Sequence, residues 1–256
     1  MSEIAWLQTP GAEDRTVFEQ VGRAPDATVN YGELPEQVID IYLGSERELP
    51  LLVLIHGGYW RNEYDRLHMR PFAAALADAG WQVALIEYQR SPGRPYLMTA
   101  DVRDAIKFAI EEIPDHSGSA VLIGHSAGGQ LAMWAASVTP NLKSVIALAP
   151  VSDLGAGEAL HLDEGAIESF LGAPASERSD LDPMHITTLG NQISIIHGDK
   201  DMRVPIDLSI SYVAAKKSQN EKIHFIALPG IGHFELIDPR HAVWEIIQSE
   251  LNKFRN

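Results

Sequence analysis

A serine flanked by glycines has the setting of a covalent nucleophile. Gly124-His125-Ser126-Ala127-Gly128 fits the pattern G-x-S-x-G, and it lies between an apolar run and a helical pattern. A strand, a sharp turn and a helix in this order present a serine hydroxyl at the carboxyl edge of a parallel sheet. Glycines are needed there because neighbouring Cβ atoms would clash with the strained turn. The pattern predicts Ser126 as the nucleophile of an acyl-transfer reaction.

A serine hydroxyl becomes a good nucleophile only when a base accepts its proton, so the chain must also supply a histidine. Of the ten histidines, His233 follows the last predicted strand in the glycine-containing loop "LPGIGHFEL". His56 and His125 border the predicted site but belong to turns, and His197 and His224 fall in predicted strands. The others are expected in helices, connections or an insertion, mostly at the surface: His68, His116, His161, His185 and His241. We expect His233 to be the base.

A carboxylate is needed to fix the imidazole tautomer and to stabilise its protonated form. The stretch "IIHGDKDMRVP" ends a predicted strand and offers Asp199 and Asp201. Asp201 is favoured because it lies further along the loop, whereas Asp199 suits a turn cap. Asp153, just after another strand, is a more distant alternative. The order of Ser126, Asp201 and His233 along the chain is the order typical of α/β-hydrolases.

The segment "LLVLIHGGYWRN" predicts donors for a negatively charged oxygen. Gly57 and Gly58 let the backbone turn its N–H groups inward without a Cβ in the way. We expect the amides of Gly58, Tyr59 and Ala127 to face the oxyanion, where the loss of one donor typically costs about 3 kcal/mol. A plain Gly-Gly turn is the alternative. Tyr59, Trp60, Arg61 and His125 are the predicted substrate-binding residues around this loop.

Short apolar runs alternate with longer amphipathic segments along the chain, which predicts an α/β fold. The runs expected to be strands are 38–43, 51–55, 82–88, 120–124, 144–150, 193–198 and 223–228. The first alternates as a half-buried strand would, and the other six read as strands buried on both faces. The segments expected to be helices are 70–80, 99–113, 127–138, 206–219 and 238–254. Together they predict a mostly parallel central sheet with helices on both faces.

The spacing between the predicted strands at 144–150 and 193–198 is unusually long. It contains short helical pieces such as "EGAIESFLG". We therefore expect a single domain over residues 1–256, with a small cap insertion at about 152–190. A disordered linker is the alternative, which the Leu, Ile and Phe spacing disfavours.

Composition excludes several kinds of chemistry. The 256 residues contain no cysteine, so disulfides, thiolate nucleophiles and cysteine-bound zinc are ruled out. A net charge of −15 argues against a nucleic-acid partner. No apolar run is long enough to span a bilayer, and the first residues lack a signal-peptide layout. We expect a cytoplasmic protein without a cofactor, metal ion or membrane partner, and a homodimer is compatible with the sequence.

These motifs resemble those of a known superfamily. From about Val38 onward the chain is similar to the α/β-hydrolases, and "HGGYW" resembles the oxyanion loop of α/β-hydrolase-type kynurenine formamidases (arylformamidases). The related hormone-sensitive-lipase-like esterases carry His-Gly-Gly-Gly there, and "YGELPEQVIDIYL" and "GHSAGG" also look like that group. The resemblance implies the triad Ser126, Asp201 and His233, with the loop of Gly57, Gly58 and Tyr59 facing the oxyanion.

The resulting hypothesis is a serine hydrolase that cleaves small carboxylic esters or aryl formamides through an acyl-serine intermediate. A formamidase acting on N-formylkynurenine should offer a cation to the substrate carboxylate, for which Arg61 and Arg203 are the candidates. A general carboxylesterase and a small peptidase or amidase are the enzymatic alternatives. A catalytically silent, hydrolase-fold protein that binds a small molecule is the alternative from another class.

Overall fold

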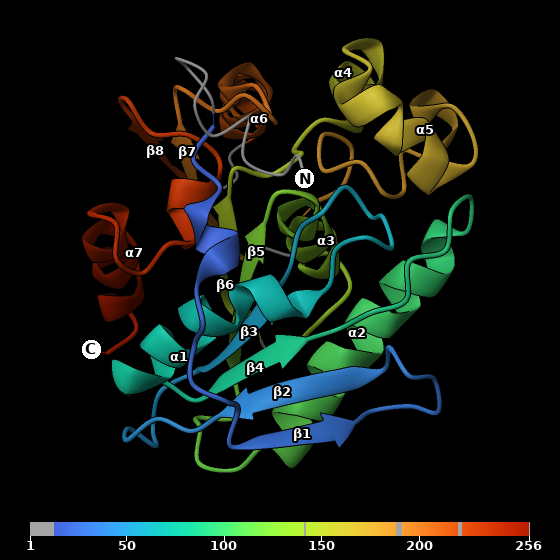
Figure 1. Cartoon of the computed structure of the whole chain (residues 1–256). Helices are drawn as coiled ribbons and strands as arrows, with labels where there is room; N and C mark the ends of the chain where they lie inside the picture. The colour runs from blue at the N-terminus through green and yellow to red at the C-terminus, as the bar shows by residue number, and fades with distance from the viewer. Residues whose placement is uncertain (1–12, 141, 188–190, 220–221, 256) are drawn as a thin grey trace, which may run out of the picture.

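The protein is built around one eight-stranded sheet (Figure 1). The structure, a computed structural model, describes residues 13–140, 142–187, 191–219 and 222–255. The strands run in the order β1-β2-β4-β3-β5-β6-β7-β8 across the sheet. Their bounds are β1 Ala27–Asn30, β2 Val38–Tyr42, β3 Leu51–Ile55, β4 Val83–Ile86, β5 Ala120–His125, β6 Leu142–Leu148, β7 Gln192–Gly198 and β8 Ile223–Leu228. Strands β1 and β2 are antiparallel to their neighbours, and the other six are parallel. The predicted α/β-hydrolase fold is confirmed.

Alternating side chains of the central strands belong to two separate apolar clusters, one on each face of the sheet. In β3, Leu51, Val53 and Ile55 join one apolar cluster, whereas Leu52 and Leu54 join the other. Successive strand residues point to opposite faces, so a strand covered on both sides must be apolar throughout. All five residues of β3 are buried, as its unbroken aliphatic run predicts.

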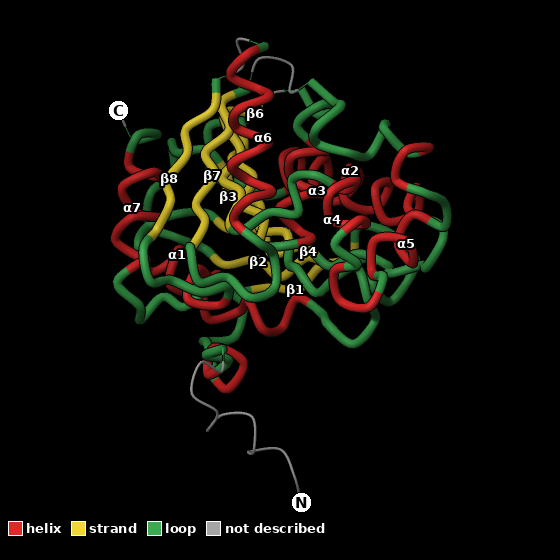
Figure 2. Tube along the Cα trace, turned by 90° about the horizontal axis from the view of Figure 1, so that it is seen from above, coloured by secondary structure: helices red, strands yellow, loops and turns green. Residues whose placement is uncertain are grey.

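Helices cover both faces of the sheet, as predicted. Seen from above, α1 and α7 lie on one side of the strands, and α2, α3 and α6 lie on the other (Figure 2). Their bounds are α1 Arg70–Asp78, α2 Pro95–Glu112, α3 Ala127–Ala135, α6 Ile206–Ser218 and α7 Val243–Asn252. Helix α2 starts four residues before the predicted start at Thr99, because Pro95 occupies its first turn, where a proline is tolerated. Helix α7 starts five residues after the predicted start at Asp238, because a turn precedes it.

The two edges of the sheet differ from the prediction. Strand β1 was not predicted, because its short and largely exposed sequence lacks an apolar signature. Strand β8 was expected to be buried on both faces, but it is the edge strand beside β7, and His224 and Ala227 are exposed. An edge strand has one neighbour fewer, so part of its surface meets solvent.

The long connection between β6 and β7 folds into short helices instead of a linker. They are α4 Leu154–Ala159, η4 Leu162–Glu164, α5 Ala166–Leu171 and η5 Ala175–Glu177. Ile167, Phe170 and Leu171 are buried in the core cluster that also contains helices α2 and α3. Residues 188–190, at the end of the predicted cap, lie outside the described residues. Within the described ranges, no helix is both long and apolar enough to cross a membrane.

Helix α3 packs against the end of β3 at backbone distance. A Cβ built on Gly128 would lie 2.2 Å from the carbonyl oxygen of Ile55 and 2.4 Å from that of His56. A Cβ on Gly124 would lie 2.2 Å from the Gly128 carbonyl oxygen. Contacts this short force backbone to move, so only glycine fits at both positions. The glycines of G-x-S-x-G therefore allow the strand–turn–helix segment around Ser126, here called the elbow, to pack directly against the "HGG" loop.

We predict that Gly128→Ala lowers the free energy of unfolding by about 1–3 kcal/mol, the usual cost of overpacking. Gly155→Ala on α4 is the matched control, since a Cβ there meets only Asp153 Oδ1, at 3.6 Å. Denaturant unfolding of both variants checks this. Equal stabilities of the two variants would contradict the close-packing account.

Candidate active site

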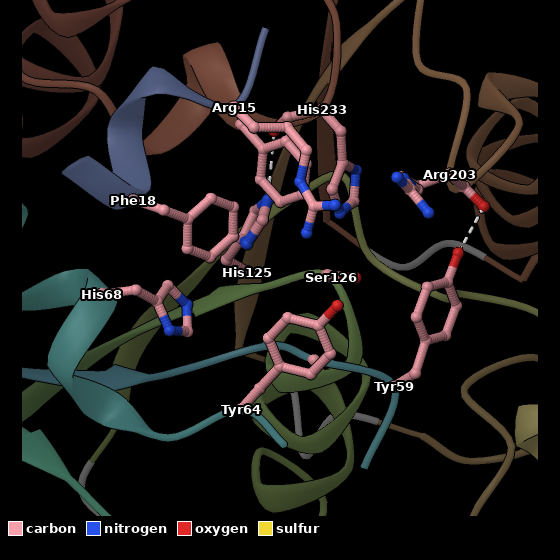
Figure 3. Close-up of a pocket in the computed structure, with 11 residues that line it drawn as sticks. Arg15, Phe18, Tyr59, Tyr64, His68, His125, Ser126, Arg203 and His233 are labelled. Atoms are coloured by element: carbon pink, nitrogen blue, oxygen red, sulfur yellow. Dashed lines mark hydrogen bonds between the residues drawn. The ribbon is translucent and has the colours of Figure 1, made fainter. Parts of the chain in front are cut away.

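A small cavity opens beside Ser126, which directly follows strand β5, and Figure 3 shows the side chains that line it. It is formed by segments far apart in the sequence. Its lining residues are Arg15, Phe18, Gly58, Tyr59, Tyr64, His68, His125, Ser126, Arg203, His233 and Phe234. Ser126 and His233 thus face the same space, although 107 positions separate them in the chain.

Ser126 sits on a sharp turn between β5 and α3. Its φ of 57° and ψ of −121° are unfavourable for a residue with a side chain, and the tight packing around it maintains that conformation. A Cβ on Gly57 would lie 2.9 Å from Ser126 Cβ, so the oxyanion-loop backbone passes directly beside the serine. The strand–turn–helix geometry predicted for Ser126 is present.

His233 is held by the predicted carboxylate. Its Nδ1 lies 2.6 Å from Asp201 Oδ2, and both side chains are almost completely buried. An ionised carboxylate only accepts hydrogen bonds, so Nδ1 carries the proton and Nε2 is left as the basic atom. This is the tautomer that a general base requires.

Asp201 is kept ionised by its surroundings. Burial alone would raise the pKa of this carboxyl, but His233 and His197 beside it hold the pKa well below its usual range. Its Oδ1 also accepts hydrogen bonds from the amides of Arg203 and Val204, both at 2.8 Å. The side chain is therefore fixed in place on three sides.

The two alternative acids have other partners. Asp199 is exposed and accepts a hydrogen bond from the Gly230 amide at 2.7 Å, which is the turn-capping role that the sequence suggested. Asp153 caps helix α4 through the amide of Ala156, at 2.7 Å. Asp201 is thus the candidate acid that contacts His233.

Ser126 and His233 are not hydrogen-bonded to each other in the described part of the chain. Both side chains line the same cavity. Catalytic hydrogen bonds of this kind are often long until substrate binds.

The "HGGYW" loop adopts an unusual backbone path. Gly58, Tyr59 and Trp60 all have positive φ, at 112°, 50° and 57°. Among the described residues, no acceptor is recorded for the amide of Tyr59 or for that of Ala127 at the start of α3. Both residues are nevertheless buried. Strained backbone and buried, unpaired donors next to Ser126 are what an oxyanion site requires.

Tyr59 is the aromatic residue of this loop that lines the cavity. Its hydroxyl donates a hydrogen bond to the Arg203 carbonyl oxygen at 2.6 Å (Figure 3). Burial raises the pKa of this phenol, so Tyr59 stays protonated and neutral. The bond ties the oxyanion loop to the loop that carries Asp201.

Trp60 and Arg61 were predicted to bind substrate, but the structure places both outside this cavity, beside a neighbouring depression. Trp60 is buried and stacks on Phe170 of α5 with ring centres 4.4 Å apart. Arg61 forms an ion pair with Asp163 of η4, with Nη2 and Oδ2 3.1 Å apart. The reversed backbone at residues 58–60 directs these side chains toward the β6–β7 connection. Of the two candidate cations, Arg203 lines the cavity.

His125, also predicted to bind substrate, forms part of the cavity wall. It is buried, and burial together with the nearby His233 holds its pKa well below the usual range, so it is neutral. Its Nε2 donates to the carbonyl oxygen of His233 at 3.1 Å. The residue before Ser126 therefore holds the backbone of His233.

Several lining residues were not predicted from the sequence. Phe18 belongs to η2 (Thr16–Glu19), and its ring meets Phe234 of η6 (Phe234–Ile237) at 4.9 Å. Arg15 extends over both rings, and Arg203 pairs with Glu13 at 2.7 Å. No motif marks this N-terminal segment. The adjacent apolar residues Val17 and Phe18 in "RTVFE" were the available signal.

His68 was expected at the surface but lines the cavity. Burial, followed by the proximity of His56, lowers its pKa to about 3, which leaves the ring neutral. Its helix η3 (Arg66–Met69) follows the oxyanion loop and folds back beneath it. The position of His68 in the sequence does not indicate that helix η3 lies beside the cavity.

Comparison with known protein families identifies the family of this chain. The family model BD-FAE matches residues 39–215, more than two thirds of the chain. The chain belongs to the BD-FAE family.

Curated relatives of this family member are similar over most of its length. It is 25% identical to the kynurenine formamidase of Danio rerio over 221 residues, which cover 82% of this chain and 75% of the fish protein. It is 23% identical to esterase LipC of Mycobacterium tuberculosis, covering 82% of this chain and 60% of LipC, less than two thirds of that relative. The solved structure of esterase B from Lactobacillus rhamnosis superposes with a TM-score of 0.76 at 18% identity, covering 94% of this chain and 88% of that one. The structural match shows the fold, and the curated relatives support a hydrolase function.

Among the described residues, no group of three or more His, Cys, Asp or Glu side chains is arranged to hold a metal ion.

We predict a pH-dependent stability difference between the wild-type protein and Asp201→Asn. The folded pKa of Asp201 lies below its unfolded value of about 3.9, so its ionised form stabilises the fold above that pH. The advantage of the wild-type protein, roughly 1–3 kcal/mol, should shrink as the pH falls from about 5 to about 3.

Urea unfolding at several pH values measures this difference, with Asp199→Asn as the control from the same loop. The account fails if Asp199→Asn shows the same pH-dependent loss, or if Asp201→Asn shows none.

Proposed function

We propose that this protein is a serine hydrolase that cleaves small carboxylic esters or aryl formamides through an acyl-serine intermediate. The observation that carries the proposal is the 2.6 Å contact between His233 Nδ1 and Asp201, in a cavity that Ser126 also lines. Position and tautomer make His233 the base, and the strained elbow makes Ser126 the nucleophile.

The reaction proceeds in two proton-balanced steps. Ser126 Oγ bonds to the carbonyl carbon while His233 Nε2 takes the hydroxyl proton, and the resulting oxyanion faces the amides of Gly58, Tyr59 and Ala127. Collapse breaks the bond to the leaving alcohol or amine, which receives that proton from His233. A water molecule then gives its proton to His233 and attacks the acyl-serine, and the released acid leaves Ser126 with its proton restored.

The cavity itself supports a small acyl group. It is small, and Phe18 and Phe234 wall one side of it. Its apolar walls suit a short acyl chain or an aryl group, and a folded peptide segment would not fit. This favours an esterase or formamidase over the peptidase alternative.

The formamide and ester readings are supported by different relatives. The Danio rerio relative is a kynurenine formamidase and the mycobacterial relative is an esterase. Arg15 and Arg203 at the cavity are compatible with a substrate that bears a carboxylate, as N-formylkynurenine does. We further propose that the helices between β6 and β7 form a cap, because Trp60 and Arg61 join them to the oxyanion loop.

We predict that Ser126→Ala lowers kcat by at least about 10³-fold for any substrate that the wild-type protein hydrolyses, because the acyl-serine can no longer form. The assay compares p-nitrophenyl acetate, N-formylkynurenine and an aminoacyl amide side by side.

Ser152→Ala is the matched control. Ser152 is fully buried and does not line the cavity, and its hydroxyl has no partner among the described residues, so its removal should leave kcat unchanged. Unchanged hydrolysis by Ser126→Ala would refute the serine mechanism. Binding without turnover by the wild-type protein would favour the silent, small-molecule-binding alternative.

A further inference from the structure

His56, the first residue of the "HGGYW" motif, is completely buried between two hydrogen-bond acceptors. Its Nδ1 lies 2.7 Å from the carbonyl oxygen of Gly57, and its Nε2 lies 2.9 Å from Glu87 Oε1. The neighbouring parallel strands β3 and β4 bring the two side chains together, because Ile55 and Ile86 are paired in register just before them.

Glu87 can serve only as an acceptor here. Its two oxygens accept the amides of Tyr88 and Arg66, each at 2.9 Å, and Arg90 pairs with the same carboxylate. Burial alone would raise the pKa of Glu87, but His56, Arg90 and these hydrogen bonds lower it to about 2. The carboxylate is therefore ionised at neutral pH.

Counting donors and acceptors then fixes the charge of the His56 ring. A carbonyl oxygen cannot donate a proton to Nδ1, and an ionised carboxylate cannot donate one to Nε2. Both ring nitrogens must carry hydrogen for the two contacts to be favourable, which makes the ring an imidazolium.

The other groups around the ring tolerate this charge. Tyr88 stacks on it with ring centres 4.5 Å apart, an arrangement that favours a cation over an aromatic face. His68 approaches edge-on at 5.9 Å and is neutral, because burial and the nearby His56 lower its pKa to about 3. Arg66 and Arg90 both pair with Glu87, whose negative charge offsets theirs.

The oxygen that His56 holds belongs to the peptide that carries the Gly58 amide. All peptide bonds in the described residues are trans, so the Gly57 carbonyl and the Gly58 N–H point in opposite directions across one rigid plane. Fixing the oxygen on the side of His56 turns the Gly58 N–H toward the cavity that Gly58 lines. The Tyr88 hydroxyl holds the preceding carbonyl, that of His56, at 2.9 Å.

A cation bonded to the carbonyl oxygen also strengthens the amide as a donor. Hydrogen bonds in a chain polarise one another, and charge-assisted bonds are the stronger kind. The Gly58 N–H should therefore meet a developing negative charge more favourably than an amide whose carbonyl faces a neutral donor.

We propose that His56 is a buried imidazolium, held by Glu87, which positions and polarises the Gly57–Gly58 peptide as an oxyanion donor. His56 and Glu87 are positioning residues, since neither lines the cavity. The catalytic part of this inference rests on the proposed hydrolase function, whereas the charge of the ring does not.

The test uses Glu87→Gln, which keeps the shape of the side chain and removes its charge. Ester hydrolysis should lose about 10- to 100-fold in kcat, less than the loss of a whole oxyanion donor, with KM within about twofold. Nitrogen-15 NMR of the histidine rings at neutral pH should show two protonated nitrogens for His56 in the wild-type protein and one in Glu87→Gln.

Glu250→Gln is the matched control. Glu250 forms a similar pair with His224 at 3.0 Å, at the start of β8 and therefore far from the carboxyl ends of the strands. Its kcat should stay within about twofold of the wild-type value. Thermal melts of both variants separate a general loss of stability from a specific loss of kcat.

The outcomes distinguish the two proposals. A singly protonated His56 ring in the wild-type protein, or an unchanged kcat in a folded Glu87→Gln, overturns this inference. Absence of hydrolysis in the wild-type protein overturns the proposed function and the catalytic part of the inference, while a doubly protonated ring still establishes the buried imidazolium. The wild-type NMR measurement decides the charge even if Glu87→Gln fails to fold.

Discussion

The site depends on the close approach of two backbones, one at the start of α3 and the other at the end of β3. Gly128 leaves room for the carbonyls of Ile55 and His56, and Gly57 leaves room for Ser126. A Cβ at either point would clash with the facing segment and force the two backbones apart. One contact therefore positions both the proposed nucleophile and the amides proposed to stabilise its intermediate, and it exists because the glycines have no side chains.

Around this contact, each strained segment is held by a bond to a different part of the fold. Tyr59 joins the oxyanion loop to the acid loop, and Trp60 and Arg61 join it to the helices between β6 and β7. His56 and Glu87 hold it from the side of the sheet. The positive φ angles at residues 58–60 persist because these contacts together outweigh the local strain. The loop is thus preorganised, as electrostatic stabilisation of a transition state requires.

The sequence predicted the parts of the molecule that obey local rules. The aliphatic run at Leu51–Ile55 and the glycine pattern around Ser126 gave the central strand and the elbow, because burial and backbone strain restrict which residues fit. Roles that depend on long-range contacts were not readable. Arg61 pairs with Asp163, about a hundred positions away in the sequence. Phe18 lines the cavity together with residues as far away in the sequence as Phe234. The edge strand β1 lacks the apolar pattern from which a strand could be predicted.

The central claim is that Ser126 is a nucleophile activated in this cavity. The most direct test is to incubate the wild-type protein with a fluorophosphonate and to map the adduct by peptide mass spectrometry, with His233→Ala alongside. The account predicts one phosphonyl group on Ser126 of the wild-type protein and very slow labelling of His233→Ala. An unlabelled wild-type protein, or an adduct on another residue, would contradict it.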